Sequence, residues 1–197
     1  MPPRLRLFIA VDPPSETAAQ AGRIIERLKR LGLDATWVNP AHLHLTLHFL
    51  GNNVDEADLH GICVAMNAAC GSLPPIDVAF GGVGAFPDAK NPRTIWLGVR
   101  EGIAGLVALH DALATQLGPL GFPAEERRYR PHVTLGRLRR EKGGGPLATT
   151  VLAEELERLT ELAAGTAEIA EVTLYASRLD RDGPEHERLH VADLQGR

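Results

Sequence analysis

Two short segments, separated by nearly half the chain, repeat one pattern: His44-Leu45-Thr46-Leu47 and His132-Val133-Thr134-Leu135. In a β-strand, residues two apart point to the same side. Each segment therefore predicts a strand with a histidine and a threonine on one face and apolar side chains on the other. Such a strand buries its apolar face and leaves its polar face along an open surface. Because the pattern occurs twice, we expect two related halves that each contribute one strand to a shared cleft.

The rest of the chain alternates between strand and helix patterns without a strict one-to-one order. Apolar runs bounded by Gly, Pro, Asn or Asp predict strands over residues 5–11, 42–50, 76–80 (extending toward 86), 94–99, 131–138, 168–176 and 189–194. Helical apolar stripes predict helices over residues 15–32 (capped by Ser15), 55–70, 102–117 (with Ile103 in its stripe) and 151–162, and a flexible connector at 142–146. We therefore predict an α+β fold. It is a bilobal pseudo-twofold duplication in which two mostly antiparallel sheets line a central cleft and helices pack outside.

Charge and cysteine content limit the setting in which this chain works. The formal net charge is −4, so any contact with nucleic acid has to come from a local basic patch. Cys63 and Cys70 lie two turns apart in a predicted helix, too far to form a disulfide with each other. Reduced thiols favour a reducing compartment, so we expect a cytoplasmic protein. No apolar run approaches the roughly 18 residues of a membrane span, so we expect no membrane contact.

The paired motifs suit phosphodiester chemistry. A neutral histidine can take a proton from water while a protonated one donates to the departing sugar oxygen, because the usual imidazole pKa of about 6.5 lets both forms coexist. His44 and His132 are therefore the candidate catalytic residues. The hydroxyls of Thr46 and Thr134 can hydrogen-bond the phosphate oxygens. A single histidine on a strand face is more often structural, and it is the repetition that favours catalysis.

A metal centre is the competing interpretation. His42, His44 and His48 have the same parity and are expected on one strand face. However, His42 and His48 would lie roughly 20 Å apart on an extended strand, which is too far for one ion. We therefore expect neither a metal nor another cofactor.

The second motif lies among basic residues, with Arg127, Arg128 and Arg130 before it and Arg137, Arg139, Arg140 and Lys142 after it. One interpretation is a solvated face that nearby glutamates partly offset, and the other is a path for an RNA backbone. Arg137, three residues after Thr134, is the candidate phosphate ligand. Arg130 is a candidate RNA contact, and Phe49 is a candidate partner for a base.

On these motifs the chain resembles the two-histidine (2H) phosphoesterase superfamily, and within it the bacterial and archaeal RNA 2′,3′-cyclic phosphodiesterases, also called 2′-5′ RNA ligases or LigT-like proteins. The resemblance spans nearly the whole chain. It includes residues 6–11, 44–51, 84–87, 93–99 and 130–137 and the terminal Ser177…Gly183-Pro184. In one departure, His186 stands where the family often has a tyrosine.

The resemblance implies one bilobal domain over residues 1–197 and metal-independent hydrolysis of an RNA-terminal 2′,3′-cyclic phosphate to a 2′-phosphate. It carries catalytic roles to His44 and His132, and phosphate binding to Thr46, Thr134 and Arg137. Joining or cleaving a 2′-5′ linkage is related family chemistry. The implied partners are RNA ends, tRNA fragments among them, and we expect a monomer. We assign His44 as the acid and His132 as the base. The alternatives are a phosphodiesterase for a small cyclic nucleotide and a non-catalytic module that binds nucleotides or RNA.

Overall fold

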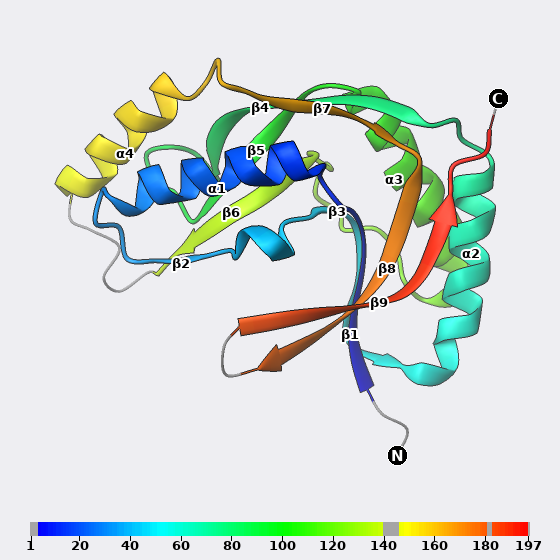
Figure 1. Cartoon of the computed structure of the whole chain (residues 1–197). Coiled ribbons are helices and arrows are strands. Elements are labelled where there is room, and N and C mark those ends of the chain that lie inside the picture. Colours follow the sequence, from blue (N-terminus) through cyan, green and yellow to red (C-terminus); the bar gives the residue numbers. More distant parts are fainter. Residues whose placement is uncertain (1–3, 140–145, 181–182, 197) are drawn as a thin grey trace.

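The computed structural model describes residues 4–139, 146–180 and 183–196, and one connected antiparallel sheet dominates this part of the chain (Figure 1). Its strands follow the order β7-β4-β5-β6-β3-β1-β8-β9, and β2 pairs with β6. The strands are β1 (Arg4–Val11), β2 (Ala35–Trp37), β3 (Leu45–Asp55), β4 (Ile76–Phe86), β5 (Thr94–Glu101), β6 (His132–Leu138), β7 (Ala163–Ile169), β8 (Glu171–Asp180) and β9 (Gly183–Asp193).

The two motif strands, β3 and β6, lie at the centre of this sheet. Their direct pairing is short, with a single paired position at Leu45 and Val133. On either side the order is matched, because β1 and β5 flank the centre and β8 and β4 come next. The α+β fold with two related halves is therefore confirmed. The prediction of two separate sheets is not confirmed, because the Leu45–Val133 pair joins the halves into one.

The helices cover the sheet in a crossed arrangement. They are α1 (Ser15–Lys29), α2 (Leu59–Gly71), α3 (Ile103–Leu117) and α4 (Pro146–Arg158), with 3-10 turns η1 (Pro40–His42), η2 (Glu56–Asp58) and η3 (Gly118–Leu120). α1 lies between β1 and β2 in the chain but packs against β6 and β7, whereas α3 lies between β5 and β6 and packs against β3. One helix from each half thus packs against strands of the other half. Figure 1 shows α1 and α4 together over one end of the sheet and α2 and α3 together beside β8 and β9. The single-domain organisation of residues 1–197 stays a prediction.

Several predicted boundaries were wrong. The strand predicted over residues 42–50 runs from Leu45 to Asp55. It starts later because His42 belongs to η1, and it continues past Leu50 because a bulge in its pairing with β1 accommodates Gly51. β2 and β7 were missed, since β2 has only three residues and β7 reads Ala-Ala-Gly-Thr-Ala-Glu-Ile, with little β-branched content. Ser15 is the first residue of α1 and makes no cap, because Pro14 occupies the cap position. Ile103 is 43% exposed and does not belong to the core.

The segment Ile103–Leu120 is long and apolar enough, by length and composition, to cross a membrane, which the sequence analysis did not expect. Its leucine stripe, however, is fully buried within the fold: Leu106, Leu109, Leu113 and Leu117. α3 also packs against α2 and β3. One side of α3 therefore packs into the fold.

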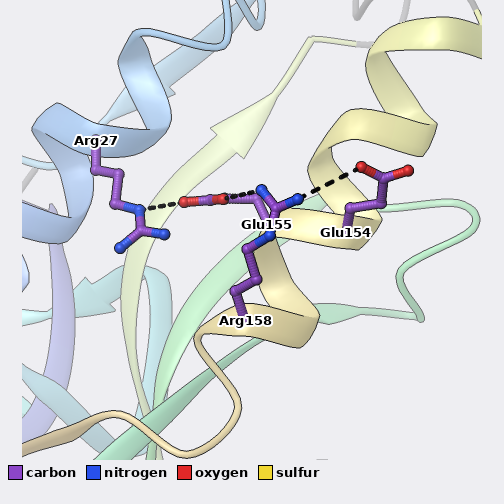
Figure 2. A network of polar contacts seen from close by, with 4 residues as sticks. All are labelled: Arg27, Glu154, Glu155 and Arg158. Atoms are coloured by element: carbon purple, nitrogen blue, oxygen red, sulfur yellow. Dashed lines mark hydrogen bonds and ion pairs between the residues drawn. The ribbon is translucent and has the colours of Figure 1, made fainter.

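α4 is fastened to α1 by the ion-pair network in Figure 2. The carboxylate of Glu155 is 6% exposed and accepts hydrogen bonds from Arg27 of α1 and, at 3.2 Å, from Arg158. The hydrogen bond from Arg27 is the main reason why the pKa of this carboxyl lies below its usual value. The connector predicted at residues 142–146 lies outside the described residues as far as Gly145, and Pro146 begins α4.

Candidate active site

The first candidate histidine directly precedes β3. Asn39 caps η1 by accepting a hydrogen bond from the backbone of Ala41, and the chain then extends into the motif. The Nδ1 atom of His44 lies 2.9 Å from the carbonyl oxygen of His42. A carbonyl oxygen can only accept, so Nδ1 carries the hydrogen and Nε2 is left as the atom for proton transfer.

The second candidate histidine repeats this geometry. The Nδ1 atom of His132 lies 2.7 Å from the carbonyl oxygen of Arg130, again two residues earlier in the chain. Each imidazole also rests on an aromatic ring of its own half: His44 on Phe8, with centroids 4.7 Å apart, and His132 edge-to-face on Phe86, at 5.0 Å. The two motifs therefore present the same histidine tautomer, and each imidazole packs against a phenylalanine ring.

The central strand pairing brings the four motif side chains together. Because Leu45 pairs antiparallel with Val133, one step along each strand places Thr46 beside His132 and His44 beside Thr134. Val133 and Leu45 are both fully buried, so the polar side chains occupy the other face. Each histidine thus has the threonine of the other motif as its neighbour.

A β-bulge follows each motif and changes which residues share the motif face. Ala10 and Ile9 of β1 pair with Thr46 and His48, and Trp96 and Ile95 of β5 pair with Thr134 and Gly136, so one residue is extra on each motif strand: Leu47 on β3 and Leu135 on β6. Strict alternation would place Arg137 on the opposite face from Thr134. The bulge brings it to the same face, and it does the same for Phe49 in the first half.

The same bulge turns His48 away from His44, so the prediction that His42, His44 and His48 share one face was wrong. His48 is 4% exposed, and its Nε2 donates to the carbonyl oxygen of Phe122 at 3.1 Å. His42 belongs to η1 and not to the strand. Among the described residues, no group of three or more His, Cys, Asp or Glu side chains is arranged to hold a metal ion.

Burial is the main reason why the pKa values of both candidate histidines lie below the usual 6.5. The positive charge of Arg137 lowers the pKa of both, so its guanidinium acts on the two imidazoles at once. The remaining neighbours differ: the carboxylate of Asp12 raises the pKa of His44, whereas Arg127 lowers that of His132 further.

Much of the protein surface beside His44 was not predicted from the sequence. The carboxylate of Asp12, the residue after β1, accepts a hydrogen bond from the hydroxyl of Tyr175 at 2.7 Å. The ring of His186, on β9, lies edge-on to His44 with centroids 5.2 Å apart, and burial lowers its pKa to about 4. The departure at His186 is therefore part of the site. Its strand pairs with β8, far along the chain from β3, so no local signal indicated this contact.

Two pockets flank the motif strands. The first, which we call the arginine pocket, has a volume of about 320 Å³, and its walls include Thr46, Phe49, Arg127, Arg128, Arg130, His132, Thr134 and Arg137. The second, the aromatic pocket, has a volume of about 420 Å³, and its walls include Asp12, His42, His44, Tyr175, His186 and Arg188. All seven candidate residues from the sequence thus line one pocket or the other. One face of the Phe49 ring is already covered by the guanidinium of Arg6, 4.6 Å from its centre.

The two cysteines lie away from these pockets, on α2, and both are free thiols. Cys70 is buried, and burial raises its pKa to about 11, so it stays protonated. The free thiols agree with the prediction that the two cysteines are not paired with each other.

Comparison with known proteins agrees with this geometry. A family model described as the 2′-5′ RNA ligase superfamily matches residues 13–181. A relative from Thermotoga maritima, named RNA 2′,3′-cyclic phosphodiesterase, is 33% identical over 195 residues, which cover 98% of this chain and 97% of the relative. A relative of the same name from Methanothermobacter thermautotrophicus is 31% identical over 191 residues, 97% of this chain and 100% of its own.

Solved structures give the same answer. A Thermus thermophilus protein superposes with a TM-score of 0.77 at 25% identity, over 98% of this chain and 99% of its own. The E. coli protein LigT, solved in complex with 3′-AMP, superposes with a TM-score of 0.73 at 25% identity and the same coverage.

Proposed function

From the premise that this chain belongs to the 2′-5′ RNA ligase superfamily, we propose that it is an RNA 2′,3′-cyclic phosphodiesterase that opens a terminal ribose 2′,3′-cyclic phosphate to a 2′-phosphate. The observation that carries this proposal is the repeated geometry of His44 and His132. Each Nδ1–H is held by a backbone carbonyl, so each Nε2 is free to transfer a proton. Hydrolysis of a phosphodiester needs one proton taken and one given.

In this proposal the Nε2 atom of His132 accepts a proton from water as the water oxygen attacks phosphorus. The P–O3′ bond breaks, and Nε2–H of His44 donates its proton to the departing O3′. The product is a 2′-phosphate with a free 3′-hydroxyl. This assignment of roles is supported by the neighbours of each ring, because the carboxylate of Asp12 favours a protonated His44, whereas Arg127 favours a neutral His132.

The phosphate oxygens are proposed to lie between the hydroxyls of Thr46 and Thr134, with the guanidinium of Arg137 facing the developing charge. The register places these three side chains on one face, which supports a shared ligand. Every step uses protein groups alone, so the reaction is proposed to proceed without a metal.

The arginine pocket supports RNA rather than a mononucleotide as the substrate. Arg127, Arg128 and Arg130 are exposed and line it together with Arg137, and a row of guanidinium groups suits a chain of phosphates. The physiological substrates are proposed to be RNA ends with a cyclic phosphate, tRNA fragments included. Joining of 2′-5′ ends through the same cyclic phosphate, action as a monomer and a cytoplasmic location complete the proposal.

The test is incubation with an oligonucleotide that ends in a 2′,3′-cyclic phosphate. We expect a product whose terminal phosphate becomes sensitive to phosphatase, with the phosphate on O2′ by phosphorus NMR and the same rate in the presence of a chelator. A double variant, His44→Ala with His132→Ala, is the control. Binding without turnover would favour a non-catalytic module, and strict dependence on added Mn²⁺ or Zn²⁺ would contradict the metal-free mechanism.

A further inference from the structure

The loop over residues 121–131, which we call the arginine loop, has no helix or strand of its own and carries Arg127, Arg128 and Arg130. It leads into β6, the second motif strand, yet it is held by the first. The Nε2 atom of His48 donates to the carbonyl oxygen of Phe122, and the hydroxyl of Tyr129 donates to the carbonyl oxygen of Thr46 at 3.0 Å. Both anchors lie on β3, and the exposed arginines lie between or beside them.

Tyr129 is well fixed for this contact. Its ring stacks on the imidazole of His110 from α3, with centroids 4.2 Å apart and planes 6° from parallel. Burial raises the pKa of its hydroxyl well above the usual 10, so the hydroxyl keeps its proton and donates at neutral pH. A single hydrogen bond therefore joins a rigid ring to the backbone of the first motif.

The position of Tyr129 in the chain gives this bond its significance. The next residue, Arg130, supplies the carbonyl oxygen that accepts from Nδ1 of His132. Thr46, in the first motif, is thus connected to the imidazole of His132, in the second, by two hydrogen bonds and one intervening peptide. Arg127, whose charge lowers the pKa of His132 and whose guanidinium lies 5.3 Å from the Phe86 ring, is on the same loop.

We propose that Tyr129 is a positioning residue that sets the orientation of His132 relative to the first motif, by fastening the arginine loop to the backbone of Thr46. The proposal deepens the proposed function and rests on it only for its kinetic consequences. Loosening this bond frees the Arg130 carbonyl to move, and a misplacement of a catalytic group by about 1 Å can cost about 100-fold in rate. The loss of one net hydrogen bond alone corresponds to about 5-fold.

The test is Tyr129→Phe, which keeps the ring on His110 and removes only the hydroxyl. The matched control is Ser72→Ala, which removes a side-chain hydroxyl that donates to the carbonyl oxygen of Ala69 at 2.8 Å. Ser72 follows α2 and lines neither pocket. The first measurement needs no activity: imidazole nitrogen NMR of His132. We expect the protected Nδ1–H signal in the wild type and in Ser72→Ala, and its loss or broadening in Tyr129→Phe.

The second measurement is the pH profile of kcat/KM on a nucleoside 2′,3′-cyclic phosphate. The bond to Arg130 raises the pKa of His132, so Tyr129→Phe should shift the limb that reports His132 to lower pH and reduce kcat by roughly 5- to 100-fold. A merely structural role would leave the surviving folded enzyme with an unchanged profile. If neither the wild type nor any variant hydrolyses the substrate but the NMR signals differ as expected, the proposed function fails and the positioning role stands.

An unchanged His132 signal in Tyr129→Phe would overturn the proposal. If Tyr129→Phe does not fold, His110→Ala removes the ring beneath Tyr129 and leaves the hydroxyl in place. The same loss of the Nδ1–H signal is then expected in a weaker form, and a wild-type spectrum would contradict the proposal.

Discussion

The two halves of the cleft share a backbone and differ in side chains. Both motifs hold their histidine by a bond to the carbonyl two residues earlier, and both are followed by a bulge. At the position that each bulge brings to the motif face, the second half has Arg137 and the first half has Phe49. The duplicated backbone thus supplies a matched pair of imidazoles, while the arginines around His132 make the second half the more cationic one.

The charged neighbours of the two imidazoles also differ. His44 has the carboxylate of Asp12 in its surroundings, whereas His132 has the guanidinium of Arg127. Two histidines with the same tautomer would otherwise be interchangeable. We infer that these unequal charges assign the acid to the first half and the base to the second.

The largest expected effect comes from removing either imidazole. On an oligonucleotide with a natural cyclic phosphate, His44→Ala and His132→Ala should each reduce kcat by roughly 100- to 10,000-fold, because each removes one proton transfer. Steady-state or single-turnover rates will measure this. His60→Ala is a suitable control, because His60 lies on α2 and lines neither pocket. A loss below 10-fold in one motif variant would contradict paired catalysis, since only one half would then be catalytic.

The next effect concerns the cationic half. Arg137→Ala should lower kcat/KM by roughly 10- to 100-fold through the loss of charge-assisted contacts with phosphate. It should also shift the pH profile of kcat/KM to higher pH, because the guanidinium lowers the pKa of both histidines. In the free enzyme the pKa values of both histidines lie below 6.5. As the pH rises, activity that needs a protonated histidine should therefore begin to decline at a lower pH than it would with an ordinary imidazole.

Arg139→Ala is the matched control, since this exposed arginine follows two residues later and faces Asp34 at 3.7 Å. We expect a change of less than about 3-fold for it, in keeping with the small effect of exposed charges. Equal losses in the two variants would show a diffuse field of positive charge instead of a phosphate ligand.

The smallest expected effect lies outside the cleft, where α4 meets α1. Glu155→Gln should reduce the free energy of unfolding by about 1–2 kcal/mol, because it removes a buried carboxylate that accepts from Arg27 and Arg158. Denaturant unfolding will measure this. Glu154→Gln, an exposed residue 3.9 Å from Arg158, should change stability by less than about 0.5 kcal/mol. Unchanged turnover by the folded Glu155→Gln enzyme is also expected.

Local patterns in the sequence predicted the α+β class, the motif strands and most of the helices. They predicted His44, Thr46, His132 and Thr134 on one surface because strand parity is a local property. The face of Arg137 could not be derived from parity, since it depends on a bulge that is defined only by pairing with β5. For the same reason His48 was placed on the wrong face.

Contacts between distant segments were the other gap. His186 reaches His44 from β9, and Tyr175 reaches Asp12 from β8. The packing that joins β1, β8 and β9 decides these contacts, and no spacing along the chain encodes it. Tyr129 illustrates the same limit, because its hydrogen bond to Thr46 spans the two halves.

The most direct test of the central claim, that the two halves divide the acid and base roles, is a change of leaving group. A cyclic phosphate with sulfur in place of O3′ needs little protonation when its bond to phosphorus breaks. We predict that this substrate restores most of the rate lost in His44→Ala and leaves His132→Ala as impaired as before. Restoration of His132→Ala with no restoration of His44→Ala would contradict it.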